Sequence, residues 1–189
     1  SAGYFVAREK WTPTASGMSF STPGPGIMYN HAHDDALHLQ LVVKGVPMVG
    51  TPMSELKQHV HQDRYYGTRK RGHFFAMTSH NLVLVGGEPA ESIESLAPRG
   101  RYGAYPIPVK ATWEQIDGGI HAKGTHRGYE GVTLSREVTF QYRKGWTVVD
   151  RVKGHVGKAN IARWHFEYGV DVEADEEGFV ATCGKVRLG

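Results

Sequence analysis

The stretch Val132-Thr133-Leu134-Ser135-Arg136-Glu137-Val138-Thr139-Phe140-Gln141-Tyr142 shows the clearest alternation of apolar and polar residues in the chain. A period of two places one set of side chains on each face of an extended strand. A turn at residues 143–145 (Arg-Lys-Gly) leads into a second alternating stretch, from Trp146 to Val152. The two stretches therefore predict a long antiparallel hairpin with one buried face.

Two charged residues interrupt the apolar face of this hairpin. A turn that brings Tyr142 opposite Trp146 sets the expected register. In that register Val138 faces Asp150, and Arg136 lies diagonally from Asp150. Diagonal neighbours lie within reach of long side chains, and buried charges need partners. We therefore expect an ion pair between Arg136 and Asp150, with a structural role.

The rest of the chain has the composition of an all-β protein. Short strand-like stretches occur at residues 4–8, 27–29, 39–43, 46–49, 82–85, 111–116, 119–124, 161–172 and 179–187. Residues 12–26 and 88–106 are expected to be loops, the former because it is rich in Pro and Gly. Residues 54–65 are the one stretch compatible with a helix. This pattern predicts an antiparallel β-sandwich or barrel with at most one short helix.

Length and composition narrow the classes of protein. A chain of 189 residues predicts a single domain, residues 1–189. The net charge of +3 is too small to indicate a nucleic-acid partner, and the chain has no run of 18 apolar residues that could span a membrane. The single Cys183 excludes an internal disulfide. The chain stops on a strand-like pattern at residues 186–189, so we expect a piece of a longer protein.

Titratable residues gather just before a buried strand. Residues 29–38 contain His31, His33 and Asp35, which share one face if the backbone is extended. His80 leads into another buried strand and could reach the same place. Imidazole and carboxylate groups suit Zn²⁺, so this set is a candidate metal site. The alternative is a surface or hydrogen-bonded histidine cluster without metal.

A second group of residues suits acid–base chemistry on an anionic substrate. His31 can exchange a proton near neutral pH, and Tyr65 or Tyr66 can donate one beside a cation. Basic side chains follow the same region, namely Arg64, Arg69, Lys70 and Arg71. They form either a clamp for an acidic substrate or a solvated loop, and the tyrosines could equally pack against the sheet. Residues 126–129 are expected to be a turn with an aromatic anchor.

The order of these segments resembles the heparinase II/III-like family of polysaccharide lyases. The matching segments are His31-Ala32-His33-Asp34-Asp35-Ala36-Leu37, Lys44-Gly45-Val46-Pro47, Arg64-Tyr65-Tyr66, Thr78-Ser79-His80-Asn81, His126-Arg127-Gly128-Tyr129, residues 148–154 and Trp164-His165-Phe166. The resemblance implies a β-sandwich of the supersandwich type. It also implies an N-terminal α-helical toroid that this chain lacks, and a secreted or periplasmic bacterial enzyme.

The same resemblance implies roles for individual residues. Family members cleave uronic-acid polysaccharides, such as heparan sulfate or alginate, by β-elimination. By position, His31 corresponds to the catalytic base, and His33 and His80 correspond to ligands of a structural Zn²⁺. A tyrosine of the pair Tyr65 and Tyr66 corresponds to a residue of the substrate cleft. The polymer itself is not specified, because the basic residues suit sulfated and unsulfated uronates alike.

One expected ligand is missing. The family's third Zn²⁺ ligand is an aspartate after the second strand of the 39–49 hairpin, where we place Gly50. Either Asp35 or a water substitutes, or the site holds no metal. Without the toroid, the chain alone is expected to be inactive. Two alternatives therefore stay open: a non-catalytic carbohydrate-binding or scaffolding relative, and a cupin-like metal enzyme. The second would need a glutamate soon after His33, where the sequence has His38.

Overall fold

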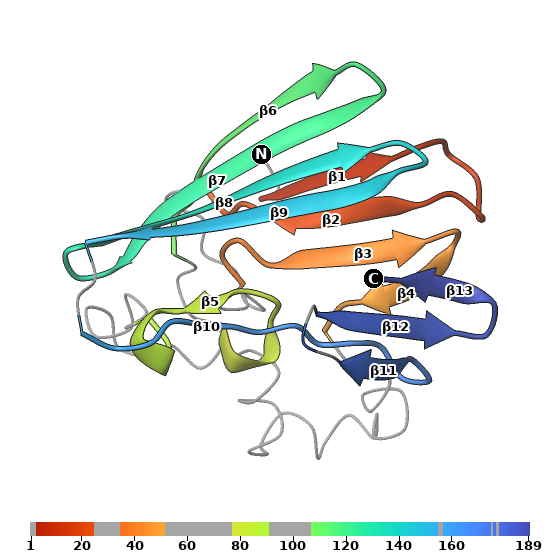
Figure 1. Cartoon of the computed structure of the whole chain (residues 1–189). Coiled ribbons are helices and arrows are strands. Elements are labelled where there is room, and N and C mark those ends of the chain that lie inside the picture. Colours follow the sequence, from red (N-terminus) through yellow and green to blue (C-terminus); the bar gives the residue numbers. More distant parts are fainter. Residues whose placement is uncertain are drawn as a thin grey trace, which may run out of the picture.

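The computed structural model describes residues 3–24, 35–51, 77–90, 107–154, 157–174, 176 and 178–189. Two four-stranded antiparallel sheets dominate the described chain (Figure 1). The first sheet contains β1 (Tyr4–Arg8), β2 (Gly17–Ser21), β3 (Leu39–Val43) and β4 (Val46–Val49), in that order. The second contains β6 (Lys110–Ile116), β7 (Gly119–Tyr129), β8 (Val132–Gln141) and β9 (Gly145–Lys153). Neighbouring strands in each sheet follow one another along the chain, so both sheets are meanders.

Smaller elements surround the first sheet. A three-stranded sheet of β11 (Asp171–Ala174), β12 (Phe179–Cys183) and β13 (Val186–Leu188) lies beside β3 and β4 (Figure 1). The short strand β5 (Val83–Leu84) pairs with β10 (Ile161–Ala162) and is flanked by the 3-10 helices η1 (Met77–Ser79) and η2 (Val85–Gly87). A bridge between Val49 and Phe166 attaches the segment after β10 to the end of β4.

The core lies between the two large sheets. On β8 every second side chain is buried, as the alternation predicts: Val132, Leu134, Arg136, Val138 and Phe140. A side chain at Gly124 of β7 would collide with Leu37 and Phe20, so β7 faces the first sheet at close range. The fold is therefore the expected antiparallel β-sandwich. The helix expected at residues 54–65 lies outside the described residues. No helix among the described residues is long and apolar enough to cross a membrane.

Several local predictions were wrong. The expected loop at 12–26 contains strand β2, and the expected turn at 126–129 is the end of β7, where the pairing with β8 shifts register. The single strand expected at 161–172 is two short strands, β10 and the start of β11, and residues 82–85 contribute only Val83–Leu84 as strand. At 12–26 and 126–129, polar and Gly-rich residues concealed strands that backbone pairing with neighbouring strands forms. At 82–85 and 161–172, apolar residues suggested more strand than the pairing of β5 with β10 provides.

The register of the β8–β9 hairpin differs from the prediction by two residues. Phe140 pairs with Trp146, and their rings stack with centroids 4.9 Å apart. Arg136 therefore lies directly opposite Asp150, and not diagonal to it. The expected ion pair is confirmed, with 2.7 Å between Arg136 Nε and Asp150 Oδ1. The shift leaves the facing set of side chains unchanged, because it moves the pairing by a whole period of the strand.

Candidate functional site

Most of the predicted site residues lie outside the described part of the chain. These are His31, His33, Arg64, Tyr65, Tyr66, Arg69 and Arg71. Asp35, His80 and Gly50 are described. They show the surroundings of residues 35–38, the described end of the histidine segment (residues 29–38). The predicted roles in catalysis and substrate binding stay predictions.

Asp35 begins a tight turn that delivers the chain into β3. Its backbone carbonyl accepts a hydrogen bond from the His38 N–H at 2.8 Å, and Leu37 within the turn has φ of 69°. A left-handed backbone at a leucine costs about 1 kcal/mol or more. Hydrogen bonds hold it: the Leu37 N–H donates to the Ser21 carbonyl, and the Leu37 carbonyl accepts from Arg136. The Asp35 carboxylate, which is buried, accepts from the Tyr4 hydroxyl at 3.0 Å.

The turn presents His38 to His80 and Thr51, and all three side chains are buried. Thr51 Oγ1 lies 3.3 Å from His38 Nε2 and 3.1 Å from His80 Nδ1. The two imidazole rings are 4.8 Å apart between centroids. A single hydroxyl thus joins two histidines that are 42 residues apart in the sequence.

The hydrogen-bond pattern assigns the protons of His38. The backbone N–H of Asn81 donates to His38 Nδ1 at 2.9 Å, so this nitrogen carries no proton and the ring proton lies on Nε2. His38 therefore donates to the Thr51 hydroxyl. That hydroxyl can then donate its own proton to His80 Nδ1, or accept a second bond from it. Thr51 can therefore bond to His80 Nδ1 in either tautomer of His80.

Asn81 connects the cluster to the surrounding backbone. Its side-chain N–H groups donate to the carbonyls of Leu39 and Gly50, at 2.9 and 3.2 Å. Its side-chain oxygen accepts from the His165 N–H, and its backbone carbonyl accepts from Arg136. Asn81 is fully buried. It therefore fixes the relative positions of β3, the end of β4 and the segment after β10.

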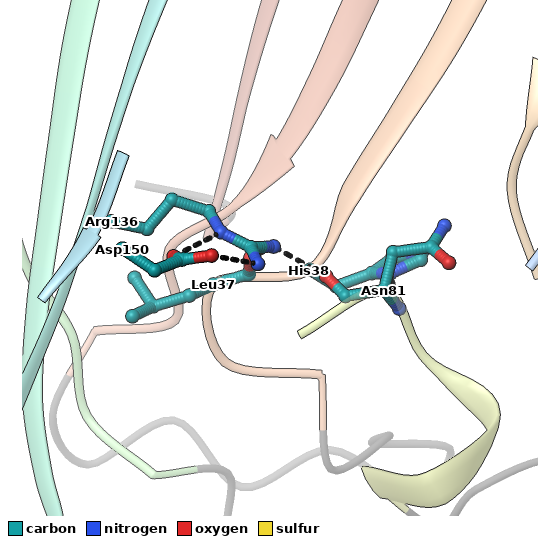
Figure 2. A network of polar contacts seen from close by, with 5 residues as sticks. All are labelled: Leu37, His38, Asn81, Arg136 and Asp150. Carbon is teal, nitrogen blue, oxygen red and sulfur yellow. Dashed lines mark hydrogen bonds and ion pairs between the residues drawn. The ribbon is translucent and has the colours of Figure 1, made fainter. Parts of the chain in front are cut away.

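Arg136 reaches the cluster from the second sheet (Figure 2). Its guanidinium binds both carboxylate oxygens of Asp150, at 2.7 and 2.9 Å, and donates to the carbonyls of Leu37 and Asn81. Its side chain is 1% exposed, and the ring of Trp164 lies 5.5 Å from the guanidinium carbon. A charge at such a depth is tolerated because its carboxylate and carbonyl partners compensate for the lost water.

Gly50 occupies the position where the family has a carboxylate ligand, but a side chain at this position would be directed at Glu167. A Cβ atom at Gly50 would lie 2.2 Å from Glu167 Oε1, so a carboxylate from the segment after β10 fills that volume. Burial raises the pKa of Glu167, and no described residue forms an ion pair or hydrogen bond with its carboxylate. The residue whose side chain reaches His80 from the end of β4 is Thr51.

A cavity of about 620 Å³ lies between β3, the β8–β9 turn and the C-terminal strands. Its lining includes the aromatic residues Trp146, Trp164 and Phe179. Basic side chains also line it, among them Arg143 and Arg187. Aromatic faces with nearby cations suit a sugar that carries acidic groups.

Sequence reasoning identified His80 but missed its partners. Thr51 and Glu167 were not singled out, and Asn81 and His165 were noted only as parts of motifs. His38 was noted only as the residue where a cupin-like site would need a glutamate. The Ser79-His80-Asn81 and Trp164-His165-Phe166 motifs were the available signals, since both run through the cluster. Thr51 gave no signal, because threonine is enriched in β-structure and a single one marks no site.

Comparison with known proteins places this arrangement in a family. The model of the family described as heparinase II/III-like, C-terminal, matches residues 1–186. The chain therefore belongs to the heparinase II/III-like family, as its C-terminal part. A search of curated proteins gave no match.

Solved structures share the fold. A heparinase III structure is 16% identical with a TM-score of 0.71, and covers 95% of this chain. Heparan sulfate lyase HepC from Pedobacter heparinus is 17% identical with a TM-score of 0.68, and covers 96%. The chain spans about a quarter of the length of these relatives, 25% and 26% respectively.

The described residues do not by themselves fit the Zn²⁺ site that the family resemblance implies. No three His, Cys, Asp or Glu side chains converge among the residues that the structure describes. Asp35, the substitute ligand we considered, binds Tyr4. The side chain against His80 Nδ1 is a neutral hydroxyl, which is not among the usual protein ligands of Zn²⁺.

Proposed function

We propose that this chain is the β-sandwich part of a polysaccharide lyase that cleaves uronic-acid polysaccharides, of the heparan sulfate or alginate kind, by β-elimination. The family match over residues 1–186 is the observation that carries the proposal. In the complete protein an N-terminal α-helical toroid covers the sandwich and forms the other wall of the cleft. The protein acts in the periplasm or outside the cell, where such polymers occur.

In the proposed reaction, the histidine segment supplies the base, and residues 64–71 supply the acid and the groups that bind the substrate. His31 removes the proton beside the uronate carboxyl group, and a tyrosine at 65 or 66 protonates the leaving oxygen. Arg64, Arg69 and Arg71 hold the anionic chain by charge. The buried cluster around Asn81 and Arg136 supports this segment, because it fixes the turn that follows the histidines.

The test is an activity assay on the complete protein that carries this chain. Incubation with alginate or heparan sulfate should produce the ultraviolet absorbance of an unsaturated uronate. His31→Ala should lower kcat at least about 100-fold, since general base catalysis contributes at least this much. His121→Ala, a histidine of β7 far from the segment in sequence, is the matched control and should keep full activity. Absence of product on every uronate polymer would contradict the proposal.

A non-catalytic carbohydrate-binding protein is the second candidate, and the cavity lined by Trp146, Trp164 and Arg187 favours it. In that case the protein binds an anionic polysaccharide without cleaving it. Arg187→Ala should weaken binding measured by affinity electrophoresis, whereas Lys185→Ala, an exposed residue outside the lining, should not. Equal affinity of the two variants would exclude this cavity as the binding site.

A further inference from the structure

The cavity at one end of the sandwich is lined by a group of basic side chains. The connection between β1 and β2, the β3–β4 turn and the β8–β9 turn all contribute to its lining (Figure 1). Glu9 is the one acidic residue among the described residues that line it. No described residue forms an ion pair with the basic side chains of the lining, which are Lys44, Arg143, Lys144 and Arg187. A concave surface with this excess of positive charge attracts anions.

Two of these basic residues have a backbone conformation that glycine or asparagine adopts at lower cost. Lys44 has φ of 49° and Arg143 has φ of 65°, and the only other described non-glycine residue with positive φ is Leu37. The Lys44 N–H donates to Ser16 Oγ at 3.1 Å. The Arg143 N–H donates to Glu9 Oε1 at 2.6 Å. These bonds hold the two turns through the backbone, so they require neither basic side chain. Residues with a strained backbone are enriched at functional sites.

The aromatic rings of the lining are held in place by contacts with the core. Trp146 stacks on Phe140 with 4.9 Å between the ring centroids, and Trp164 lies beside the Arg136 guanidinium at 5.5 Å. Ligand sites combine such fixed apolar surfaces with a few polar or charged groups. The volume of about 620 Å³ is that of a site for a small molecule. It suits about one or two sugar rings and not a long stretch of polymer.

We propose that this cavity binds a short acidic saccharide, or the end of a longer one, at a place separate from the histidine segment. Residues 35–38, the described end of that segment, do not line the cavity. Lys44 and Arg143 bind carboxylate or sulfate groups at the two turns, together with Arg187 of β13. Trp146 packs against a sugar ring. The choice of a sugar rests on the function proposed above, whereas the negative charge and the size of the ligand follow from the cavity.

Isothermal titration calorimetry at low salt measures binding to the complete protein that carries this chain. The probes are the unsaturated disaccharides of heparan sulfate and of alginate, which β-elimination has already produced. Neutral cellobiose and inorganic sulfate are the control ligands. At least one acidic disaccharide should bind more tightly than sulfate, and cellobiose should not bind. Sulfate binding as tight as that of the disaccharides would reduce the cavity to an anion site and overturn the proposal.

Two variants separate ligand binding from stability. Lys44→Asn and Arg143→Asn remove a charge but supply a residue that tolerates a left-handed backbone, so Tm should stay the same or rise. Each variant should raise the Kd of the disaccharide roughly threefold to tenfold, since exposed charges are partly screened by water. Lys185→Asn is the matched control, because Lys185 is an exposed residue outside the lining, and it should keep the natural Kd.

An unchanged Kd in both Lys44→Asn and Arg143→Asn would mean that the disaccharide binds elsewhere, and would overturn the proposal. A lower Tm in both variants would show that these two basic residues serve the fold, which would also overturn it. A protein that cleaves a uronate polymer but binds neither disaccharide would contradict this proposal alone. Binding without cleavage of any uronate polymer would contradict the proposed lyase activity and support the cavity site.

Discussion

At the scale of single residues, burial decides the charge of His126. The ring is 3% exposed, and its Nδ1 accepts the Gly128 N–H at 3.1 Å. Desolvation lowers the pKa of His126 from 6.5 to about 4. The unfolded chain therefore binds the proton first as pH falls, and the stability present above pH 6.5 declines between pH 6.5 and about 4. The full loss is about 3 kcal/mol, because one pKa unit corresponds to about 1.4 kcal/mol.

Urea unfolding at neutral pH and at about pH 4.5 measures this contribution. His126→Gln keeps an acceptor for the Gly128 N–H but cannot take up the proton, so it should lose less stability on acidification than the natural protein. His121→Gln, which changes a histidine of the same strand that reaches solvent, should keep the natural acid response. An acid response in His126→Gln equal to that of the natural protein would show that His126 is not responsible.

Single residues were predictable from the sequence where they broke a pattern. Arg136 and Asp150 interrupt an apolar face, and this alone predicted their pairing. Thr51 broke no pattern, and its role arises because three distant segments meet in the fold. The choice between positions 50 and 51 also needed coordinates. Beyond the end of a strand the alternation stops, so sequence does not fix which of two successive side chains points inward.

At the scale of elements, small residues on β7 allow the two sheets to approach. A Cβ atom at Gly124 would lie 2.4 Å from Leu37 Cδ2 and 3.0 Å from Val109 Cγ1. Gly124→Ala should therefore destabilise the protein by about 1–3 kcal/mol, because an overfilled core must shift its side chains. Thermal and urea unfolding measure the change. Thr125→Ala, at the neighbouring position of β7, should cost much less. Equal stability of Gly124→Ala and the natural protein would show that the interface has spare room.

The strands that were wrongly predicted from the sequence are those whose extent depends on pairing with neighbouring strands. β2 lies in a Pro- and Gly-rich stretch, yet it forms because β1 and β3 pair with it on both sides. β7 continues past the expected residue 124 to Tyr129 because β8 is long enough to pair with it, across a register shift. Patterns of side chains locate strands that have a buried face, whereas partners and bulges determine their ends.

At the scale of the whole molecule, one side chain joins three separate parts of the fold. Arg136 belongs to the second sheet, holds the turn at Leu37 that leads into the first sheet, and holds Asn81 next to β5 (Figure 2). Asn81 in turn holds His165 in the segment after β10. The support for the turn that leads into β3 is therefore a property of the assembled sandwich and not of any one sheet.

Arg136→Met tests this dependence across the molecule. Methionine keeps much of the volume but removes the partner of Asp150 and the donor to two buried carbonyls, so the free energy of unfolding should fall by about 3–5 kcal/mol. Glu137→Gln is the matched control, since it breaks the solvent-facing ion pairs with Lys123 and Arg151 and should cost about 0–1 kcal/mol. If Arg136 unites the parts, hydrogen exchange in Arg136→Met should accelerate in β3, β5 and β8 together. Faster exchange confined to β8 would instead reduce Arg136 to a local role in its own sheet.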